Sequence, residues 1–397
     1  MAQPTRICLN MIVKNESKII ERCIKSVYHL IDTWCIVDTG STDGTQDIIK
    51  GLLKDKPGIL HEKPWVNFGH NRNEGLQLAK EWGEWTLLTD ADMILVDNGF
   101  DRNMLDLACD GYDVIQDNHG VKYYNFRLLN SAKNWRCIGV THEYYSPEKG
   151  FMDRRKIDTL FFDDRGDGGS KSDKFERDIR LLTQGLIDEP GNPRYMFYLA
   201  QSYRDTQKWE DSIHWYKECA KHSHWDEEKW YAEYMVGWCM TYAQKPAEEI
   251  SKQLMHAWLM RPWRIEPVFH LALQYKNTQM WHQAYHLFKI CASAPWPGND
   301  LLFISAAPYE GLSIDEFSVA SYWVGSYEES VNAAKKLLEN GYAPNERQRL
   351  IRNIWFAEKA MGKYSRENLL TYLHDAKTRI DAKYSGKKVK NLEKTLS

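Results

Sequence analysis

Short apolar runs alternate with amphipathic segments over the first ninety or so residues of the chain. Ile7–Val13, Thr33–Val37 and the run that starts at Trp85 are continuous apolar stretches, typical of strands buried on both faces, and Gly58–His61 is a weaker one. The segments between them place apolar residues at helical spacing, as at Ile20, Cys23, Ile24 and Val27. Such alternation predicts right-handed crossovers and a mostly parallel sheet.

The run from Trp85 ends in two carboxylates, Asp90 and Asp92. We expect one long strand to carry both to the carboxyl edge of the sheet, where open α/β sheets bind their ligands. Residues i and i+2 of a strand point to the same side, and two carboxylates there repel unless a cation lies between them. Mg²⁺ and Mn²⁺ suit such oxygen ligands. The plainer interpretation is an acidic turn after a strand.

Two segments beside these strands favour anion binding. The loop Asp38–Thr45 is rich in Gly, Ser, Thr and Asp, and its amides and the helix start behind it can hold an anion. An ordinary strand-to-helix turn capped by Ser41 or Asp43 is the alternative. Arg72 lies where a helix begins and opposes the helix dipole, so we expect it to have an anionic partner, although a solvated residue is also common there.

The second half of the chain carries a different pattern. Strands are expected at Asp113–Gln116 and Tyr123–Leu129, in a mixed or antiparallel edge, and strand signals end at Phe175. Small and aromatic residues then recur with an offset of 72 positions, as in tetratricopeptide helix pairs. They are Ala200, Tyr203, Trp209, Ser212, Tyr216 and Cys219, repeated as Ala272, Tyr275, Trp281, Ala284, Phe288 and Cys291. The fold class is therefore an α/β domain at 1–174 and an all-α solenoid at 175–397, of roughly four or five helix pairs with a basic tail.

Composition narrows the class of protein. The 397 residues have a net charge of −3, which gives no indication of a nucleic-acid or membrane partner. The eight cysteines form no Cys-x-x-Cys pair and mostly lie in apolar patterns, which favours reduced, buried thiols. No signal peptide and no run of 18 apolar residues is evident, so we expect a cytoplasmic protein with peripheral membrane contact at most. The 16 tryptophans suit either the core between repeats or a concave face that binds an acceptor or a protein partner.

Four segments together resemble the GT-A nucleotide-sugar glycosyltransferases of family 2: Asn10–Glu16, Val37–Thr45, Asn71–Asn73 and Asp90–Asp92. The resemblance implies a UDP-sugar donor and Mn²⁺ or Mg²⁺ as cofactor. It implies that Asp38 accepts a hydrogen bond from uracil and that Asp92 is the firm metal ligand, with Asp90 near the ribose or metal. The implied nucleotide-sugar site consists of Asn15, Glu16, Asp38, Ser41, Arg72, Asp90, Ala91, Arg165 and Lys171.

Trp135–Tyr144 resembles the Trp…Gly-x-x-His-Glu segment of family members with helical C-terminal extensions. An inverting transferase needs a base for the acceptor hydroxyl, and a carboxylate in a partly dry cleft suits that task. We expect Glu143 to be this base, with Arg72 beside the sugar or diphosphate, and His142 to be a metal ligand or an acceptor contact. Trp135 and Arg127 are the expected acceptor contacts.

Other interpretations of this region stay open. Asp117 and the Asp163–Asp164 pair are rival bases, and His142 and Glu143 could simply end an ordinary strand. The segment 161–174 is glycine-rich and charged, and it resembles a loop that closes over the donor diphosphate. Arg165 stands where related enzymes often have histidine, which suggests a direct phosphate contact, with Lys171 helping. The composition of this segment is equally compatible with a solvated linker between domains.

The sequence thus predicts a metal-dependent, inverting glycosyltransferase that moves a sugar from a UDP-sugar to a hydroxyl. A saccharide such as a lipopolysaccharide core or another surface glycan is the expected acceptor, and a polypeptide is an alternative. A hydroxymethylated base in phage-type DNA is another, although only the basic tail from Lys377 and the Lys and Arg residues of 149–174 support it. A non-catalytic scaffold conflicts with the intact carboxylates, and a nucleotidyltransferase would need a glycine-rich basic loop at 10–16.

Overall fold

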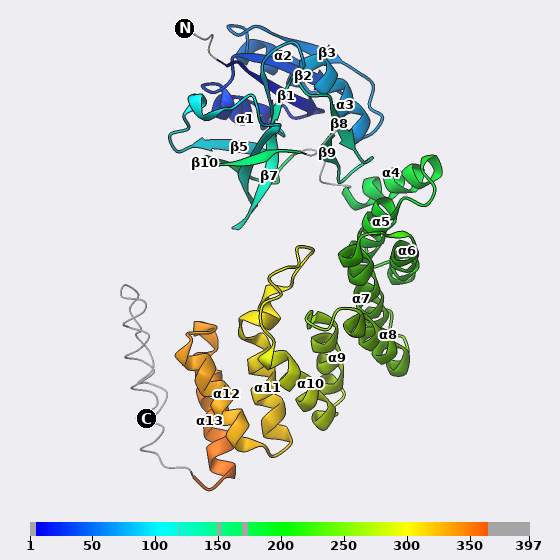
Figure 1. Cartoon of the computed structure of the whole chain (residues 1–397), viewed down its shortest axis with the longest axis vertical. Coiled ribbons are helices and arrows are strands. Elements are labelled where there is room, and N and C mark those ends of the chain that lie inside the picture. Colours follow the sequence, from blue (N-terminus) through cyan, green and yellow to red (C-terminus); the bar gives the residue numbers. More distant parts are fainter. Residues whose placement is uncertain (1–4, 119, 149–151, 169–173, 364–397) are drawn as a thin grey trace. The chain divides into compact units, whose positions relative to one another are not determined.

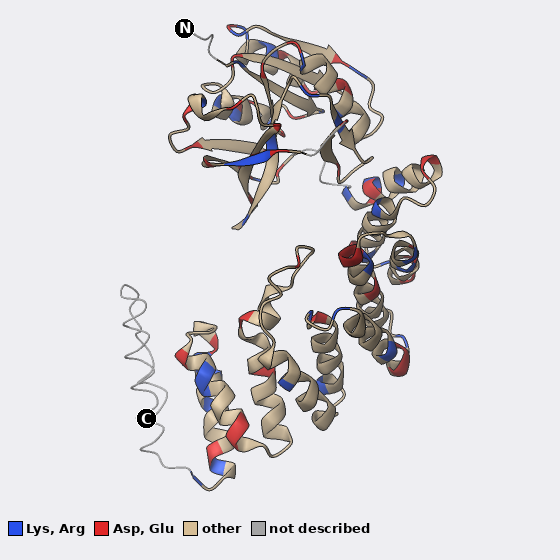
Figure 2. Cartoon of the chain, in the orientation of Figure 1, with Lys and Arg blue, Asp and Glu red and all other residues tan. Residues whose placement is uncertain are grey.

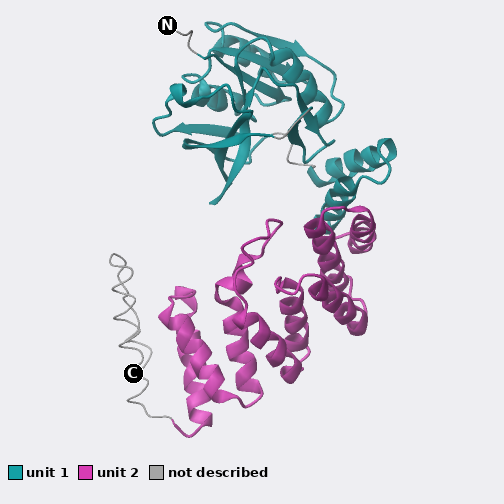
Figure 3. Cartoon of the chain, viewed as in Figure 1, with its two compact units in different colours: residues 1–206 teal, residues 207–397 magenta. Residues whose placement is uncertain are grey.

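The protein is described here by a computed structural model that covers residues 5–118, 120–148, 152–168 and 174–363 (Figure 1). The chain divides into two compact units, residues 1–206 and 207–397 (Figure 3). Strands give way to helices at Lys174, where the sequence changes character, yet the first two helices after that point belong to the same compact unit as the sheet. Lys171 and the basic tail from Lys377 lie outside the described residues.

The first unit is built on a mixed sheet with the strand order β3-β2-β1-β4-β7-β6-β10-β5. The strands β1 to β4 are parallel, as the alternating pattern predicts, whereas β7 runs antiparallel to both β4 and β6. The bounds are β1 Ile7–Val13, β2 Thr33–Asp38, β3 Gly58–Glu62, β4 Trp85–Leu88, β5 Met93–Asp97, β6 Gly111–Asn118, β7 Val121–Asn130 and β10 Arg154–Asp164, with a separate ribbon of β8 Trp135–Ile138 and β9 Tyr144–Pro147.

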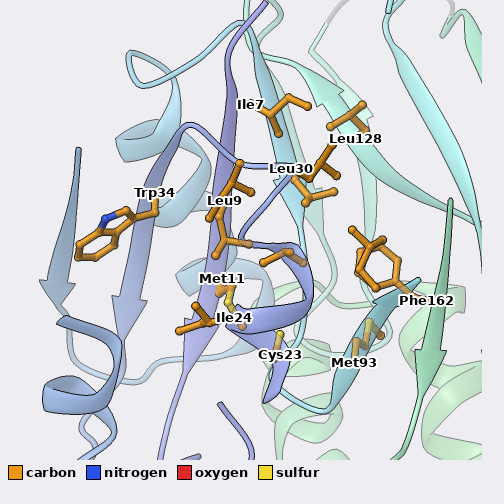
Figure 4. Packing of buried hydrophobic residues seen from close by; sticks show 14 of the residues in the cluster. Ile7, Leu9, Met11, Cys23, Ile24, Leu30, Trp34, Met93, Leu128 and Phe162 are labelled. Carbon is orange, nitrogen blue, oxygen red and sulfur yellow. The ribbon is translucent and has the colours of Figure 1, made fainter. Parts of the chain in front are cut away.

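Three helices, α1 Ile20–Val27, α2 Thr45–Leu52 and α3 Phe68–Ala79, connect the parallel strands. The main core lies against β1, and Figure 4 shows Leu9 and Met11 of that strand near Ile24 of α1. All three are at most 1% exposed. Burying each such side chain contributes about 1.5–3 kcal/mol, so this packing fixes the strand ends that carry the polar loops.

The acidic pair does not lie on one extended strand, as we expected. The strand β4 ends at Leu88, and Asp90 and Asp92 occupy the turn that leads into β5. In that turn the amide of Met93 donates to the carbonyl oxygen of Asp90 at 3.1 Å. The prediction that both carboxylates point to one side of a strand is therefore wrong, because the chain reverses within this stretch.

The helical part of the chain confirms the repeat. Ala200 and Ala272 are fully buried at equivalent places, as are Tyr216 and Phe288. Each helix of the second unit packs against the next, which gives the expected tetratricopeptide-like solenoid. The bounds are α4 Lys174–Asp188 and α5 Pro193–Asp205 in the first unit, then α6 Trp209–His222, α7 Asp226–Tyr242, α8 Ala247–Met260, α9 Glu266–Asn277, α10 Trp281–Ser293, α11 Ser313–Trp323, α12 Tyr327–Glu339 and α13 Arg347–Ala360.

The tryptophans of the helical part differ in burial, and the core interpretation is confirmed for Trp230. Trp230 is 1% exposed, and its indole N–H donates to the carbonyl oxygen of Ala257, so it belongs to the core between helices. Trp263, Trp296 and Trp323 are each about half exposed. All eight cysteines are free thiols and buried, as the sequence suggested. Within the described ranges, no helix is both long enough and apolar enough to cross a bilayer.

The stability of the helical unit is expected to depend on pH through His270 of α9. Burial lowers the pKa of His270 to about 4, where its ring lies near Tyr234 and Trp238. In the unfolded chain the value is about 6.5, so between these limits the unfolded state binds the extra proton. The free energy of unfolding should therefore fall as the pH drops from about 6.5 to about 4, by about 3 kcal/mol at most.

This expectation is checked by urea unfolding at a series of pH values. His270→Gln removes the titrating group and should flatten the acid side of the curve, whereas His256→Gln on the exposed face of α8 should leave it unchanged. Equal acid sensitivity in the wild type and the His270 variant would assign the effect to another group.

Candidate active site

A cleft of about 800 Å³ opens in the first unit at the carboxyl ends of β1 and β4. The loop after β1 contributes Lys14, Asn15 and Glu16 to its lining, and the turn after β4 contributes Asp90 and Asp92. Parallel strands end at the same edge of a sheet, which is why residues so far apart in sequence meet here. The start of α4 completes the lining with Lys174, Arg177, Asp178 and Arg180.

Asp90 lies between two arginines. Its Oδ1 atom accepts from Arg72 Nη2 at 2.7 Å and its Oδ2 atom from Arg127 Nη1 at 3.2 Å. Burial acts to raise the pKa of Asp90, but the charges of Arg72 and Arg127 outweigh it and hold that pKa well below its ordinary range. The acidic pair was expected to need a cation. For Asp90, the guanidinium groups of Arg72 and Arg127 supply that positive charge.

Arg72 has the anionic partners that its position in α3 suggested. Besides Asp90, it donates from Nε to Glu143 Oε1 at 2.5 Å, and its side chain is only 12% exposed. Burial acts to lower the pKa of Arg72, but Asp90, Tyr145 and Glu143 raise it well above the ordinary value. Arg72 therefore stays charged and links the turn after β4 to the segment that carries Glu143.

A close backbone approach brings Glu143 to this place. The amide of Phe68 at the start of α3 donates to the carbonyl oxygen of Val140, and Gly69 lies directly against Gly139. A Cβ atom at Gly69 would come within 2.2 Å of the Gly139 carbonyl oxygen, so only glycine allows this contact. The His-Glu segment consequently faces the cleft instead of ending an ordinary strand.

Asp92 is 9% exposed and lies beside the loop that follows β10. The carbonyl oxygen of Asp92 accepts from the amide of Arg165, and a Cβ atom at Gly168 would lie 3.3 Å from its carboxylate. In the part of the chain that the structure describes, no three His, Cys, Asp or Glu side chains lie close enough together to hold a metal ion. The expected trio of Asp90, Asp92 and His142 therefore does not form a metal site made of protein ligands alone.

The loops after β1 and β2 are tied together by side chains. The amide of Asn15 donates to Ser41 Oγ at 2.8 Å, and Asn15 Oδ1 accepts from the amide of Thr42 at 2.8 Å. Asp43 accepts from the amides of Ser17 and Thr45. The N-cap position of α2 is Gly44, so neither Ser41 nor Asp43 is the cap residue. Ser41 contacts the loop after β1, and Asp43 contacts both that loop and the amide of Thr45.

Asp38 at the end of β2 is fully buried, and its two carboxylate oxygens differ. Oδ1 accepts from the amides of Gly40 and Ser41 and from Gln46 Nε2, at 2.8–3.0 Å. Oδ2 is buried and has no hydrogen-bond partner. An unpaired buried acceptor is costly, about 1–3 kcal/mol, and such an atom calls for an explanation.

His142 and Asp178 form a second polar cluster in the cleft. Asp178 is 1% exposed, its Oδ1 atom accepts from Thr141 Oγ1 at 3.2 Å, and its Oδ2 atom lies 3.4 Å from His142 Nε2. The imidazole ring stacks on Tyr198 of α5, with centroids 4.1 Å apart and planes 2° from parallel. The sequence interpretation included His142 but missed Asp178 and Tyr198, which lie in the helices after the strand region.

Several expected site residues lie elsewhere. Trp135 packs on Phe126 and donates to the carbonyl oxygen of Asn130, and it is not among the residues that line the cleft. Arg165 is half-exposed and pairs with Asp163 at 2.7 Å, so its side chain is engaged by a neighbour instead of lining the cleft. Asp163 is likewise absent from the lining.

Other residues do reach the cleft. Arg127 lines it, holding Asp90 and donating to Gln116 Oε1 at 2.8 Å. Gln116 in turn donates to Asp164 Oδ2 at 2.9 Å, and both also line the cleft. Lys174 was expected to help bind the donor phosphate, and it lines the cleft. Arg177 and Arg180 were missed, although Lys174, Arg177 and Arg180 recur every three residues and so share one helix face.

Residues 8–172, which include the sheet and the loops that line the cleft, match the model of glycosyl transferase family 2. The SPbeta prophage-derived glycosyltransferase SunS of Bacillus subtilis (strain 168) is 29% identical over 230 residues, which is 54% of this chain and 53% of that protein. The glycosyltransferase SunS of Bacillus phage SPbeta gives the same figures. The chain spans about half the length of the curated relatives it matches.

Solved structures resemble the helical part of the chain. MamA aligns over 48% of this chain and 92% of its own, with 17% identity and a TM-score of 0.33. BtubC (BKLC) from P. vanneervenii aligns over 55% and 92%, with 10% identity and a TM-score of 0.37. Scores this low do not bear on the cleft or its chemistry.

Proposed function

We propose that the first unit transfers a sugar from a UDP-sugar to a hydroxyl acceptor, with inversion at the anomeric carbon. The observation that supports a UDP-sugar donor is that the buried Oδ2 atom of Asp38 has no hydrogen-bond partner. Uracil offers one N–H group that a carboxylate can accept, and a bound base would satisfy this atom. The loop from Asn15 to Glu16, tied to Ser41, lies beside the cleft and suits contacts to the ribose.

The residues present suit a divalent cation held jointly with a ligand. Mg²⁺ is usually bound by one or two carboxylates together with substrate phosphates, so no protein cluster of three ligands is needed. Asp92 lines the cleft and is the residue that would hold it, while Asp90 binds Arg72 and Arg127. When bound, such a cation neutralises charge that develops on a leaving diphosphate. Lys174, Arg177 and Arg180 add positive charge to the same cleft.

A saccharide hydroxyl remains the acceptor we propose. Figure 2 shows Lys and Arg positions interspersed with Asp and Glu positions along the coloured ribbon of both units, and the net charge of −3 does not favour the strongly basic surface that duplex binding requires. The network of Arg127, Gln116 and Asp164 provides polar groups at one side of the cleft, as recognition of sugar hydroxyls requires.

Asp38→Asn is expected to weaken UDP binding about tenfold or more, since each hydrogen bond to a charged group is worth roughly 1.5–3 kcal/mol. The asparagine oxygen would keep the place of Oδ1, where three N–H groups converge, so its NH₂ group would face the base and repel the uracil N–H. Calorimetric titration with UDP and Mn²⁺ measures this change.

Asp47→Asn is the matched control, because it removes the same charge from an exposed position of α2 and should bind UDP like the wild type. CDP, whose base lacks that N–H, should bind weakly to the wild type and lose little in the Asp38 variant. Equal affinity of wild type and Asp38→Asn for UDP would contradict the proposed donor site.

A further inference from the structure

His142 is held in an unusual backbone conformation. Its φ of 51° lies in the left-handed region, which is uncommon for residues other than glycine, although histidine, asparagine and aspartate adopt it more often than other side chains. The carbonyl oxygen of His142 accepts from Arg194 Nη2 at 2.6 Å, and its ring stacks on Tyr198. Strain of about 1–3 kcal/mol persists only where the surroundings impose it, and such residues cluster at active sites. The contacts with Arg194 and Tyr198 therefore hold this imidazole at the cleft despite the backbone strain.

The partners of the ring decide which nitrogen carries the proton. The Oδ2 atom of Asp178 lies 3.4 Å from His142 Nε2, and because a carboxylate can only accept, this contact favours the neutral tautomer that carries its proton on Nε2. That leaves a lone pair on Nδ1, for which the described residues provide no hydrogen-bond partner. Contacts of this kind are often long before substrate binds and tighten in the complex. A base oriented by a third group is the arrangement that activates nucleophiles in many enzymes.

Glu143, the base expected from the sequence, is committed elsewhere. Its Oε1 atom lies 2.5 Å from Arg72 Nε, and both side chains are nearly buried, at 14% and 12% exposure. A proton taken up by Glu143 would remove the negative charge that faces this buried guanidinium. Arg72 also holds Asp90, so Glu143 serves to position Arg72.

We propose that His142, oriented by Asp178, takes the proton from the acceptor during transfer; this rests on the proposed function. The acceptor oxygen attacks the anomeric carbon as the bond from that carbon to the diphosphate oxygen breaks, and the electron pair leaves with UDP. The acceptor proton moves to Nδ1. The resulting imidazolium is stabilised by Asp178 and gives its extra proton to solvent. Glu143 and Asp178 are positioning residues in this scheme.

The tautomer of His142 is tested without any substrate. Long-range ¹⁵N–¹H correlation spectra of histidine-labelled full-length protein, at a pH where the ring is neutral, should show the Nε2–H form, with the signal assigned by its loss in His142→Gln. Asp178→Asn should shift that signal toward a mixture of tautomers. A ring protonated on Nδ1 in the wild type would overturn the proposal.

Release of UDP from nucleotide sugars in water tests the chemistry, because water needs the same base as a hydroxyl acceptor. His142→Gln should lower the release rate on the order of 10²–10⁴-fold while UDP affinity is retained. His142→Gly relaxes the left-handed backbone and leaves a space against Tyr198, so added imidazole should restore part of the rate. A loss that imidazole does not restore would mean a structural role.

The exposed pair His29 and Asp97, 2.9 Å apart and absent from the cleft lining, is the matched control. His29→Gln and Asp97→Asn should leave the release rate unchanged. Glu143→Gln keeps an oxygen for Arg72 and should lose less activity than His142→Gln. If Glu143→Gln loses more, and imidazole does not rescue His142→Gly, Glu143 is the base and the proposal fails. A wild type that neither binds UDP nor releases it from any donor overturns the proposed function and this inference together.

Discussion

Asp90→Asn is expected to destabilise the first unit by about 3–5 kcal/mol, because it removes the carboxylate that lies between two nearly buried guanidinium groups and leaves only Glu143 beside Arg72. The side chains of Arg72 and Arg127 are 12% and 8% exposed, so solvent does little to screen their repulsion. Arg72 would also lose its position beside Glu143, and a displacement of about 1 Å in an active site costs on the order of 10² in rate. Urea unfolding and UDP release measure the two effects.

Asp163→Asn provides the comparison within the same unit. Asp163 pairs with Arg165 at 2.7 Å, but these side chains are 32% and 53% exposed, and exposed pairs contribute about 0–1 kcal/mol. Adding Arg127→Gln to Asp90→Asn should recover part of the stability, since it removes the guanidinium charge that has lost its carboxylate partner. If Asp90→Asn and Asp163→Asn destabilise the protein equally, the charge cluster does not hold the turn after β4 in place.

Arg264→Met is expected to destabilise the second unit by about 3–5 kcal/mol. Arg264 is fully buried, donates to Glu266 at 2.8–3.1 Å and to Asp300 at 3.3 Å, and lies 4.2 Å over the ring of Trp230. It also donates to the carbonyl oxygen of Leu302. Methionine would fill similar space but leave the Glu266 carboxylate buried without a cation.

The loss should appear in the unfolding transition of the helical unit, followed by far-ultraviolet circular dichroism during urea titration. Lys289→Met removes a cation that is 52% exposed and pairs with Glu329, and it should change stability by no more than about 1 kcal/mol. The double variant Arg264→Met with Glu266→Gln should be more stable than Arg264→Met. Identical transitions in the wild type and Arg264→Met would show that the buried network is not needed for folding.

Periodicity was enough to predict the parallel half of the sheet and the helical repeat, whereas β6 and β7, expected at an edge, lie inside the sheet. The buried strand Ile7–Val13 and the repeat that relates Tyr216 to Phe288 both follow from apolar spacing, which reflects local geometry and burial. The resemblance placed Asp38 and Asp90 in the correct domain, and the structure brings Asp90, Arg72 and Glu143 into contact. Such contacts depend on where strands end, and the strand pattern located the end of β4 only approximately, since the strand stops at Leu88 before both carboxylates.

The partners of each charged residue could not be predicted in the same way. Whether Asp90 faces a metal or an arginine depends on Arg127, which arrives from an antiparallel strand whose register the sequence does not reveal. Asp178 lies near His142 because α4 belongs to the same compact unit as the sheet. The sequence pattern, in contrast, placed Asp178 in the helical domain that was expected to begin at residue 175. Long-range packing of this kind leaves no periodic signal in the sequence.

The most direct test of a live sugar transferase is the release of UDP from a panel of UDP-sugars in the presence of Mn²⁺. The account predicts release from one donor, lost on addition of EDTA and lost in Asp92→Ala, while the exposed control Asp47→Asn behaves like the wild type. UDP release that persists unchanged in Asp92→Ala and in EDTA would contradict the role given to Asp92. No release from any donor, together with no UDP binding by calorimetry, would contradict the account as a whole and favour a scaffold built on the same fold.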